Sequence, residues 1–421
     1  MVLKKNRPIV ISISSFIIFA LTLLLCGCQL KNTYKYNGEI YEDSYEYKEH
    51  YGYQYLEKTN DKLAKLYEEL YLKMTDFYHK DQDANKKTYY KTFYEGNFSD
   101  GNYTKSELYQ CYMYFTSSNP KFYWMNYYFE DSGKYYFGVY KDYIKSSVRK
   151  KYDQEISEGL EKIDELVLGI DDEFLKIKTI SDYIIKNMSY AYDGKVPSDE
   201  QWAHSIIGFF DKNSGVCETY AKVFKLLCDR YNIGNLPVLS SSHIWNLVSY
   251  EDEWYVFDLT YDEGTYDYFG KTEEECNDGD HTYDKYLYEL PDNMAKTPLS
   301  LGLIELKEDD KVIYSSYSMD SINSKFNNGN YEIVMNCNDQ NKTQFYVSTL
   351  DSNYNSLTIT SNQTDSERMS LYLTKDITLT KDLTIKNIYI TSSKERLIIL
   401  EDANIYATNS RISPMVRVIK K

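Results

Sequence analysis

The sequence has no cysteines spaced in a way that suggests a disulfide framework or a zinc site. It contains seven cysteines, none of them in a C-x-x-C pair. Structural zinc sites and small disulfide scaffolds depend on such spacings, so neither is predicted. Five cysteines follow residue 28, an odd number that agrees with a reactive thiol: Cys111, Cys217, Cys228, Cys276 and Cys337.

Positive charge is also in short supply. Lys and Arg number 48 against 64 Asp and Glu, for a net charge of −16. This balance argues against a general nucleic-acid binder, which needs basic patches.

The acidic segment from Asp262 to Asp280 lacks the twelve-residue calcium loop with glycine at its sixth position, so we expect a solvated loop there.

The first 28 residues have the layout of an export signal. Three basic residues precede an apolar stretch from Pro8 to Leu25, and Cys26-Gly27-Cys28 follows. The segment resembles a bacterial lipoprotein signal cleaved before Cys28, although a small or β-branched residue is more usual where Cys26 stands. An uncleaved anchor is the alternative, since the stretch is about long enough to span a membrane. Either way we expect an extracytoplasmic protein, lipid-anchored to the bacterial cell membrane if Cys28 is acylated.

Cys217 lies in a segment typical of a helix start, Gly-Val-Cys-Glu-Thr-Tyr-Ala. Apolar residues with helical spacing follow it, Ser214 is the expected N-cap, and Asn232-Ile233-Gly234 is the expected stop. Cys217 is then in the first turn. The free N–H groups and the helix dipole favour a thiolate at that position.

His243 and Asp258 lie on two predicted strands of one hairpin with Glu251-Asp252 as its turn. A two-residue turn pairs Tyr250 with Glu253. His243 and Asp258 are then diagonal neighbours on one face, with Cβ atoms roughly 7 Å apart. A loop one residue longer would put Asp258 on the opposite face. The pattern permits an aspartate that orients an imidazole, which in turn activates a thiol.

These motifs resemble those of bacterial transglutaminase-like domains, which have the papain-like cysteine fold. The family's Gly-Val-Cys-x-Gly-Tyr-Ala motif is matched around Cys217, except that Thr219 replaces the second glycine. The His-x-Trp-Asn motif matches His243 to Asn246, and Trp-Tyr-x-x-Asp-x-Thr matches Trp254 to Thr260.

The resemblance implies a thiol enzyme that forms a thioester acyl-enzyme. Cys217 would attack a glutamine side-chain amide or a peptide bond of a protein or peptide substrate. His243 would move protons, Asp258 would hold His243, and the acyl group would pass to an amine or to water. No cofactor or metal is implied. The backbone N–H of Cys217 is one candidate oxyanion donor, and the other stays open among Tyr190, Gln201 and Trp202. His204, between apolar neighbours, is expected to be structural.

The predicted fold class is α+β, with a transglutaminase-like core between an N-terminal α/β accessory region and a C-terminal all-β module. The expected divisions are a signal peptide (1–28), a tether rich in Tyr, Glu and Lys (29–54), the accessory region (55–150), the catalytic domain (151–296) and the all-β module (297–421). Helices are expected over Leu56–Tyr78, Ser106–Thr116 and Lys176–Met188, and a hairpin over Phe122–Phe129 and Lys134–Tyr140.

In the C-terminal module, pairs of apolar residues alternate with polar ones and show no helical period. They predict a sandwich or a short solenoid. The pairs are Leu357/Ile359, Leu371/Leu373, Ile377/Leu379, Leu383/Ile385, Ile388/Ile390 and Leu397/Ile399.

Two functions of different classes are compatible with these features. One is a surface-anchored thiol acyltransferase or peptidase. The other is a binding or scaffold domain that keeps the fold without catalysis. The combination of Cys217, His243 and Asp258 favours the enzyme, whereas Thr219 is the local feature that favours the binding domain.

Overall fold

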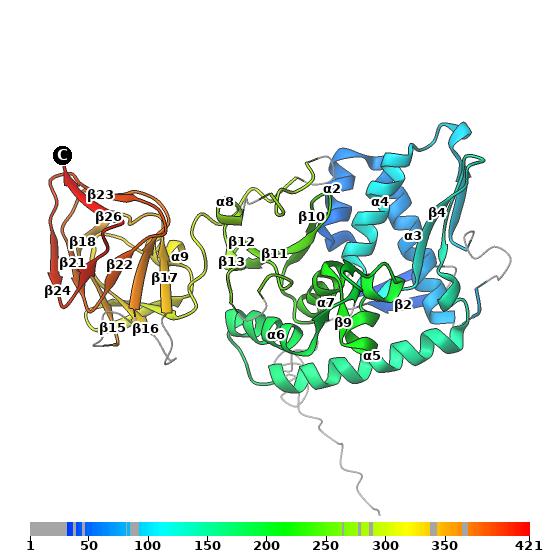
Figure 1. Ribbon diagram of the computed structural model, residues 1–421, viewed down its shortest axis with the longest axis horizontal. Coiled ribbons are helices and arrows are strands. Elements are labelled where there is room, and N and C mark those ends of the chain that lie inside the picture. Colours follow the sequence, from blue (N-terminus) through cyan, green and yellow to red (C-terminus); the bar gives the residue numbers. More distant parts are fainter. Residues whose placement is uncertain are drawn as a thin grey trace, which may run out of the picture. The chain divides into compact units, whose positions relative to one another are not determined.

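The computed structural model is a mixed α/β protein with several sheets (Figure 1). It forms two compact units, residues 1–81 and 82–421. The signal predicted over residues 1–28, including Cys28, lies outside the described residues, and so does Cys337. The described residues are 32–421 except 37–38, 44–46, 81, 85–91, 263–264, 277–278, 286–288, 337–342 and 364–368.

The first unit combines a strand hairpin with two helices. Strands β1 (Asn32–Tyr36) and β2 (Glu39–Asp43) pair antiparallel, and helices α2 (Tyr51–Thr59) and α3 (Asp61–Lys80) follow. The single helix expected over 56–78 is therefore wrong. Asn60 leaves the helical conformation and its N–H donates to the Leu56 carbonyl, which ends α2. No helix in the described part of the chain is both long and apolar enough to cross a membrane.

The segment predicted as a tether contains regular structure in its described part. It includes both strands and the start of α2. Tyr47 and Tyr53 are buried, and their rings meet edge to face at 4.9 Å between centroids. Tyrosine rings bury a large apolar area although the residue counts as polar. The segment is therefore packed despite its low content of aliphatic residues, and the prediction of a tether did not take this into account.

The second unit begins with a three-stranded sheet in the order β3-β5-β4, accompanied by helix α4. The helix and the hairpin expected here are both present, with ends shifted by a few residues. The Thr104 hydroxyl and the Glu107 carboxylate form a capping box at the start of α4, which stabilises that end. The bounds are β3 (Tyr94–Asn97), α4 (Lys105–Ser118), β4 (Met125–Phe129) and β5 (Lys134–Val139).

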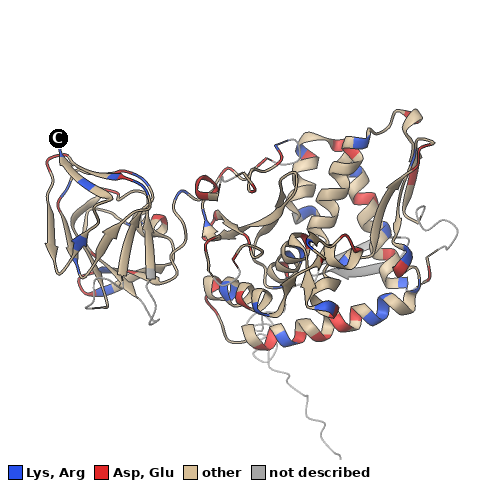
Figure 2. Cartoon of the chain, in the orientation of Figure 1, with Lys and Arg blue, Asp and Glu red and all other residues tan. Residues whose placement is uncertain are grey.

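Helix α5 (Ser146–Val167) follows and was not indicated by the apolar pattern. Only Arg149, Ile163 and Val167 are buried in it, so its apolar stripe is narrow. Lys, Arg, Asp and Glu occur along most of its length (Figure 2). Such a helix gives a weak periodic signal because most of its surface remains in water.

The central part of this unit places helix α7 against a four-stranded antiparallel sheet in the order β10-β11-β12-β13. Helix α6 packs against α7, and its N-cap is Asp172, whose carboxylate accepts from the Leu175 N–H. The bounds are α6 (Glu173–Asn187), α7 (Cys217–Arg230), β10 (Asn235–Leu239), β11 (Ile244–Tyr250), β12 (Glu253–Phe257), β13 (Phe269–Lys271) and α8 (Glu273–Cys276).

Short elements join α6 to α7. Strand β6 (Ser189–Tyr190) pairs in parallel with β9 (Ser214–Gly215), and β7 (Tyr192–Asp193) pairs antiparallel with β8 (Val196–Pro197). A 3-10 turn, η6 (Gln201–His204), lies between β8 and β9 in the chain. These elements bring Tyr190 and η6 close to the start of α7.

Beyond residue 300 the described part of the chain is mostly strand, with one short helix, α9 (Met319–Asn323). Most strands stack in parallel in three sheets, with the antiparallel pair β15-β14 at one edge. Parallel stacking of this kind is the pairing expected of the solenoid, one of the two layouts that the sequence leaves open. The sheets are β15-β14-β16-β18-β21-β24, β17-β19-β22-β25 and β20-β23-β26.

The bounds of these strands are β14 (Leu303–Glu308), β15 (Lys311–Ser316), β16 (Gly329–Asn336), β17 (Thr343–Val347), β18 (Tyr354–Ser361), β19 (Met369–Leu373), β20 (Ile377–Leu379), β21 (Leu383–Lys386), β22 (Tyr389–Thr391), β23 (Arg396–Leu400), β24 (Ile405–Thr408), β25 (Arg411–Ile412) and β26 (Val416–Lys420).

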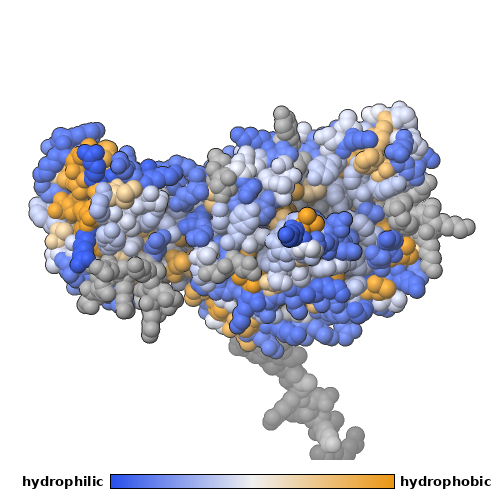
Figure 3. Space-filling model, viewed as in Figure 1, coloured by the Kyte–Doolittle hydropathy of each residue, from blue (hydrophilic) through white to orange (hydrophobic). Residues whose placement is uncertain are grey.

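The core of this region includes five of the six predicted apolar pairs, and the exception is in β23. In β23 the buried residues are Ile398 and Leu400, not Leu397 and Ile399. A strand alternates faces at every residue, so an offset of one exchanges the inner and outer side chains. The space-filling view shows hydrophobic residues gathered on part of the surface of this region (Figure 3). Near the end of the chain, Ile412, Met415 and Val418 are exposed.

Candidate active site

Cys217 is the first residue of α7, which places its thiol in the first turn as predicted. The expected N-cap is wrong. Val216 is the residue that precedes the helix, whereas Ser214 belongs to β9 and donates its hydroxyl to the Ser189 carbonyl at 3.1 Å. The helix ends at Arg230, close to the expected stop, and Asn232 takes a left-handed conformation with φ of 58°.

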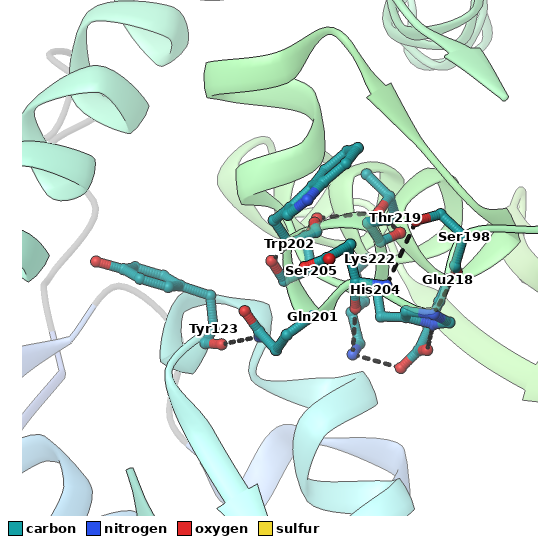
Figure 4. Close-up of polar contacts among 11 residues, drawn as sticks. Tyr123, Ser198, Gln201, Trp202, His204, Ser205, Glu218, Thr219 and Lys222 are labelled. Carbon is teal, nitrogen blue, oxygen red and sulfur yellow. Dashed lines mark hydrogen bonds and ion pairs between the residues drawn. The ribbon is translucent and has the colours of Figure 1, made fainter. Parts of the chain in front are cut away.

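Thr219, the departure from the family motif, is fully buried beside the loop that precedes α7. Its hydroxyl lies 2.6 Å from the Ala203 carbonyl and 3.0 Å from that of Ser205 (Figure 4). A Cβ at Gly215 would come within 2.4 Å of the Thr219 side chain. The larger residue is thus accommodated because Gly215 leaves space for it, and its hydroxyl ties α7 to η6.

The hairpin of β11 and β12 has the predicted register. Tyr250 pairs with Glu253 across a two-residue turn. Glu251 and Asp252 have φ of 48° and 65°, and positive φ at both central residues is what a tight hairpin turn of this type requires.

This register brings together two of the three predicted site residues. His243 directly precedes β11 and Asp258 directly follows β12. The Nε2 atom of His243 lies 2.6 Å from Oδ2 of Asp258. Their side chains are 8% and 1% exposed, so the hydrogen bond is shielded from water.

His243 also contacts the Cys217 side chain. Burial lowers the pKa of His243, but hydrogen bonding to Asp258 and to the Cys217 side chain outweighs it and raises the pKa to about 10. Such a shift means that the imidazole holds its proton firmly beside the Asp258 carboxylate. Since Nε2 is used for Asp258, the other ring nitrogen is available to the thiol. A thiolate–imidazolium pair can form from this arrangement.

The Asp258 carboxylate is held by four donors. Oδ1 accepts from the backbone N–H of Thr260 at 2.9 Å and of Tyr261 at 3.4 Å. Oδ2 accepts from His243 and, at 2.9 Å, from Nε2 of His281. Burial would raise the pKa of Asp258, but the two imidazoles lower it below its ordinary value.

His281 is the site residue that the sequence reasoning missed. It lies 23 residues after Asp258, directly after the segment predicted to be a solvated acidic loop, and it is buried. No motif marks it. The local signal that could have drawn attention to it is a histidine in a stretch otherwise rich in Asp, Glu and Tyr.

The acidic segment is less exposed at its start than expected. Asp262 is buried, and its Oδ1 accepts from the Tyr268 N–H at 2.6 Å. Burial raises the pKa of Asp262 to about 7. Within the described residues, the ligand atoms of His243, Asp258 and His281 form the group that could hold a metal ion, all within 4.8 Å of one another.

A cavity of about 490 Å³ adjoins Cys217 and His243. Helix α4 and the chain from 119 to 125 supply mainly aromatic and apolar side chains, and the loop 240–242 supplies three serines. Its charged lining consists of Asp199, His204, Glu218 and Lys222. The accessory region therefore lines the cavity next to the thiol.

His204, which was expected to be structural, makes polar contacts through both ring nitrogens. Its Nδ1 lies 2.8 Å from Glu218 and its Nε2 lies 3.0 Å from the Ser198 carbonyl (Figure 4). Lys222 donates to Glu218 at 2.6 Å and to the His204 carbonyl at 3.0 Å. The histidine thus belongs to a polar cluster in the lining of the cavity.

The three candidate oxyanion donors occupy different positions. Tyr190 contacts both the backbone and the side chain of Cys217; burial, together with the neighbouring thiol, raises the pKa of Tyr190 to about 12. Gln201 lines the cavity, but its amide donates to the Tyr123 carbonyl at 2.9 Å (Figure 4). Trp202 packs against the buried cluster of Ala191, Ala203 and Val216.

No family model and no curated protein matches the sequence. Among solved structures, the chain is similar to a TGase, at 11% identity and a TM-score of 0.25, over 32% of this chain and 43% of that chain. It is similar to a candidate cysteine protease from Cytophaga hutchinsonii, at 15% identity and a TM-score of 0.20, over 32% and 61%. A third similar structure is menin, at 13% identity and a TM-score of 0.22, over 28% and 26%. In each case the chain spans less than two thirds of the matched protein.

Proposed function

We propose that the protein is a thiol enzyme that forms a thioester acyl-enzyme on Cys217 from an amide of a protein or peptide. One observation carries this proposal. The His243 imidazole makes a buried hydrogen bond of 2.6 Å to Asp258 and also contacts the Cys217 side chain. An oriented base beside a nucleophile at a helix N-terminus is the arrangement that acyl transfer requires.

The first half of the reaction breaks the amide bond. The Cys217 thiolate attacks the carbonyl carbon, and a C–S bond forms as the carbonyl oxygen takes up negative charge. His243 then donates its proton to the amide nitrogen. The C–N bond breaks, and ammonia or an amine leaves. The backbone N–H of Cys217 and the hydroxyl of Tyr190 are the donors that we assign to the oxyanion.

The second half transfers the acyl group. His243, now neutral, takes a proton from the attacking amine or water while the nucleophile adds to the thioester carbon. The C–S bond then breaks and the Cys217 thiolate returns beside the imidazolium. An amine acceptor gives a cross-link, and water gives hydrolysis. Throughout both halves Asp258 holds Nε2 of His243 and is not itself protonated.

The test is alkylation of the full chain with iodoacetamide at neutral pH, followed residue by residue by peptide mass mapping. Cys228 is the internal control, since it lies on the same helix but is fully buried, and burial raises its pKa. We expect Cys217 to react at least tenfold faster than Cys228. A Cys217→Ala variant should lose the fast phase. Equal rates at the two positions would refute the proposal.

We further propose that Cys28 carries a lipid that anchors the protein outside the cytoplasm. The support is the basic start, the apolar stretch and the Gly27-Cys28 pair. In the native host, the protein should fractionate with membranes, and a Cys28→Ala variant should leave that fraction. A mature N-terminus that still contains Met1 would contradict lipidation, while leaving the thiol chemistry untouched.

A further inference from the structure

His281 contacts the carboxylate of Asp258 from a part of the chain remote in sequence. Its Nε2 lies 2.9 Å from Oδ2, and both side chains are only 1% exposed. The contact therefore forms out of water, where a hydrogen bond to an ionised group is strong and its loss is costly.

The ring of His281 is fixed by aromatic neighbours. Tyr268 stacks on it at 4.6 Å between centroids with an interplanar angle of 23°. Trp245 and Tyr261 meet it edge to face at 5.1 and 5.5 Å. Because the ring is packed on several sides, its Nε2–H is held in one direction, toward Asp258.

Both oxygens of Asp258 need fixed donors if the carboxylate is to keep one orientation. An ionised carboxylate offers about four acceptor sites. Two backbone N–H groups occupy Oδ1, and His243 and His281 occupy Oδ2. Without His281, three of these four donors would remain, and His243 would be the one that contacts Oδ2. The carboxylate could then turn about its χ2 bond.

We infer that His281 is a positioning residue of the active site, which holds the Asp258 carboxylate ionised and directed at Nε2 of His243. This role rests on the proposed function, in which His243 serves Cys217. His281 itself does not line the cavity beside the thiol, so it acts through Asp258 and does not touch the substrate.

The separations are those of hydrogen bonds and not of a shared metal ion. Two ligand atoms about 2.0–2.1 Å from a tetrahedral zinc ion lie roughly 3.3 Å apart. The two nitrogens are 2.6 and 2.9 Å from the same carboxylate oxygen. The geometry thus favours two N–H donors on one acceptor.

Loss of the His281 donor should change the pH response of the site. The ionisable groups around the Asp258 carboxylate are His243, His281, Asp262 and, through His243, Cys217. The two imidazoles favour its ionised form. Removing one of them should let Asp258 take up a proton at higher pH, and the hydrogen bond that orients His243 is then lost.

The experiment compares His281→Leu with His281→Gln in the full chain. Glutamine can place its Nε2–H where the imidazole Nε2–H lies, whereas leucine removes the donor and keeps a packed side chain. The rate of Cys217 alkylation by iodoacetamide is measured from pH 4 to 9. His281→Leu should react about tenfold more slowly near neutral pH, and its acid limb should move to higher pH, since a hydrogen bond to a charged group is lost. His281→Gln should recover most of the rate and the wild-type profile.

Equal losses in both variants with an unchanged pH profile would show that His281 only fills space. A wild-type rate in a folded His281→Leu protein, or a stoichiometric metal lost from that variant, would also overturn the inference.

A second readout separates this inference from the proposed function. The chain has five histidines, so the ring ¹⁵N signals of His243 can be assigned by single substitutions. In His281→Leu, the Nε2 signal of His243 should move toward that of a ring without a strong acceptor. This shift is expected even if Cys217 proves unreactive, in which case the proposed function fails and the positioning role stands. An unchanged Nε2 signal would refute the role.

Discussion

Two histidine–carboxylate pairs lie near Cys217, and they differ mainly in burial. His243 and Asp258 meet at 2.6 Å with side chains 8% and 1% exposed. His204 and Glu218 meet at 2.8 Å with side chains 40% and 27% exposed. The two pairs therefore have similar contact distances but differ strongly in solvent exposure. The first is shielded from water and salt, and the second is partly screened by both.

The second ring nitrogen of each histidine separates their roles further. His204 has acceptors on both nitrogens, Glu218 and the Ser198 carbonyl. Only the charged ring can donate to both. Both N–H groups of His204 are thus used in structural hydrogen bonds. His243 faces a carboxylate on one side and a thiol on the other. A thiol can give up and take back a proton, so His243 is suited to proton transfer while His204 is suited to an ion pair.

The sharpest way to test this contrast is to replace each carboxylate by its amide. Asp258→Asn should keep the fold but favour the wrong His243 tautomer, and we expect turnover to fall by something on the order of 10³–10⁴. Glu218→Gln should lower it by less than about tenfold, because Glu218 does not contact the imidazole that carries protons. Ammonia release from glutamine-containing peptides measures both. A folded Asp258→Asn protein within a few-fold of wild type would disprove the triad.

The parts of the site that the sequence predicted are those with short-range rules. The start of α7 follows from apolar spacing, and the hairpin register follows from a two-residue turn and a period of two. With these in place, the contact between His243 and Asp258 needs no further information. The N-cap was missed because Ser214 is taken up by strand pairing between β9 and β6, which depends on residues 25 positions away.

The remaining site residues depend on tertiary packing that no local pattern records. His281 reaches Asp258 from 23 residues along the chain, and His204 gains its carboxylate from a helix that begins 13 positions later. The same limit applies to the fold. Apolar pairs indicated the C-terminal strands, but the one-residue offset in β23 follows from its pairing with the parallel neighbours β20 and β26.

Exchange of each histidine for alanine should give a smaller but still clear contrast. His243→Ala removes the partner that holds the Cys217 thiolate, so alkylation by iodoacetamide near pH 6.5 should slow by roughly 10–100-fold. His204→Ala should change the same rate by less than about threefold. Rates that fall equally in the two variants would mean that the His204 cluster, and not His243 alone, activates the thiol.

The smallest expected effect concerns stability, and it tests whether the His204–Glu218 pair is only an ion pair. Burial opposes ionisation of Glu218, but Lys222 and His204 outweigh it and lower the pKa of Glu218 to about 2. The hydrogen bond that His204 donates to Glu218 raises the pKa of His204 above its ordinary value.

The sign of each contribution follows from these directions. A depressed carboxyl pKa stabilises the fold above the ordinary value of about 4.3, and the effect is lost as the pH falls toward 2. A raised histidine pKa stabilises it below about 6.5, and the effect is lost as the pH rises through the folded-state value.

The melting temperature of wild type should therefore exceed that of Glu218→Gln most between about pH 5 and 6. The difference should be about 1–3 °C, because partly exposed pairs contribute little. It should shrink toward pH 3, toward pH 9 and in 1 M salt, where screening is nearly complete. A difference that is large and independent of pH and salt would show that Glu218 supports the fold through packing, and the contrast between the two pairs would then not be one of electrostatics.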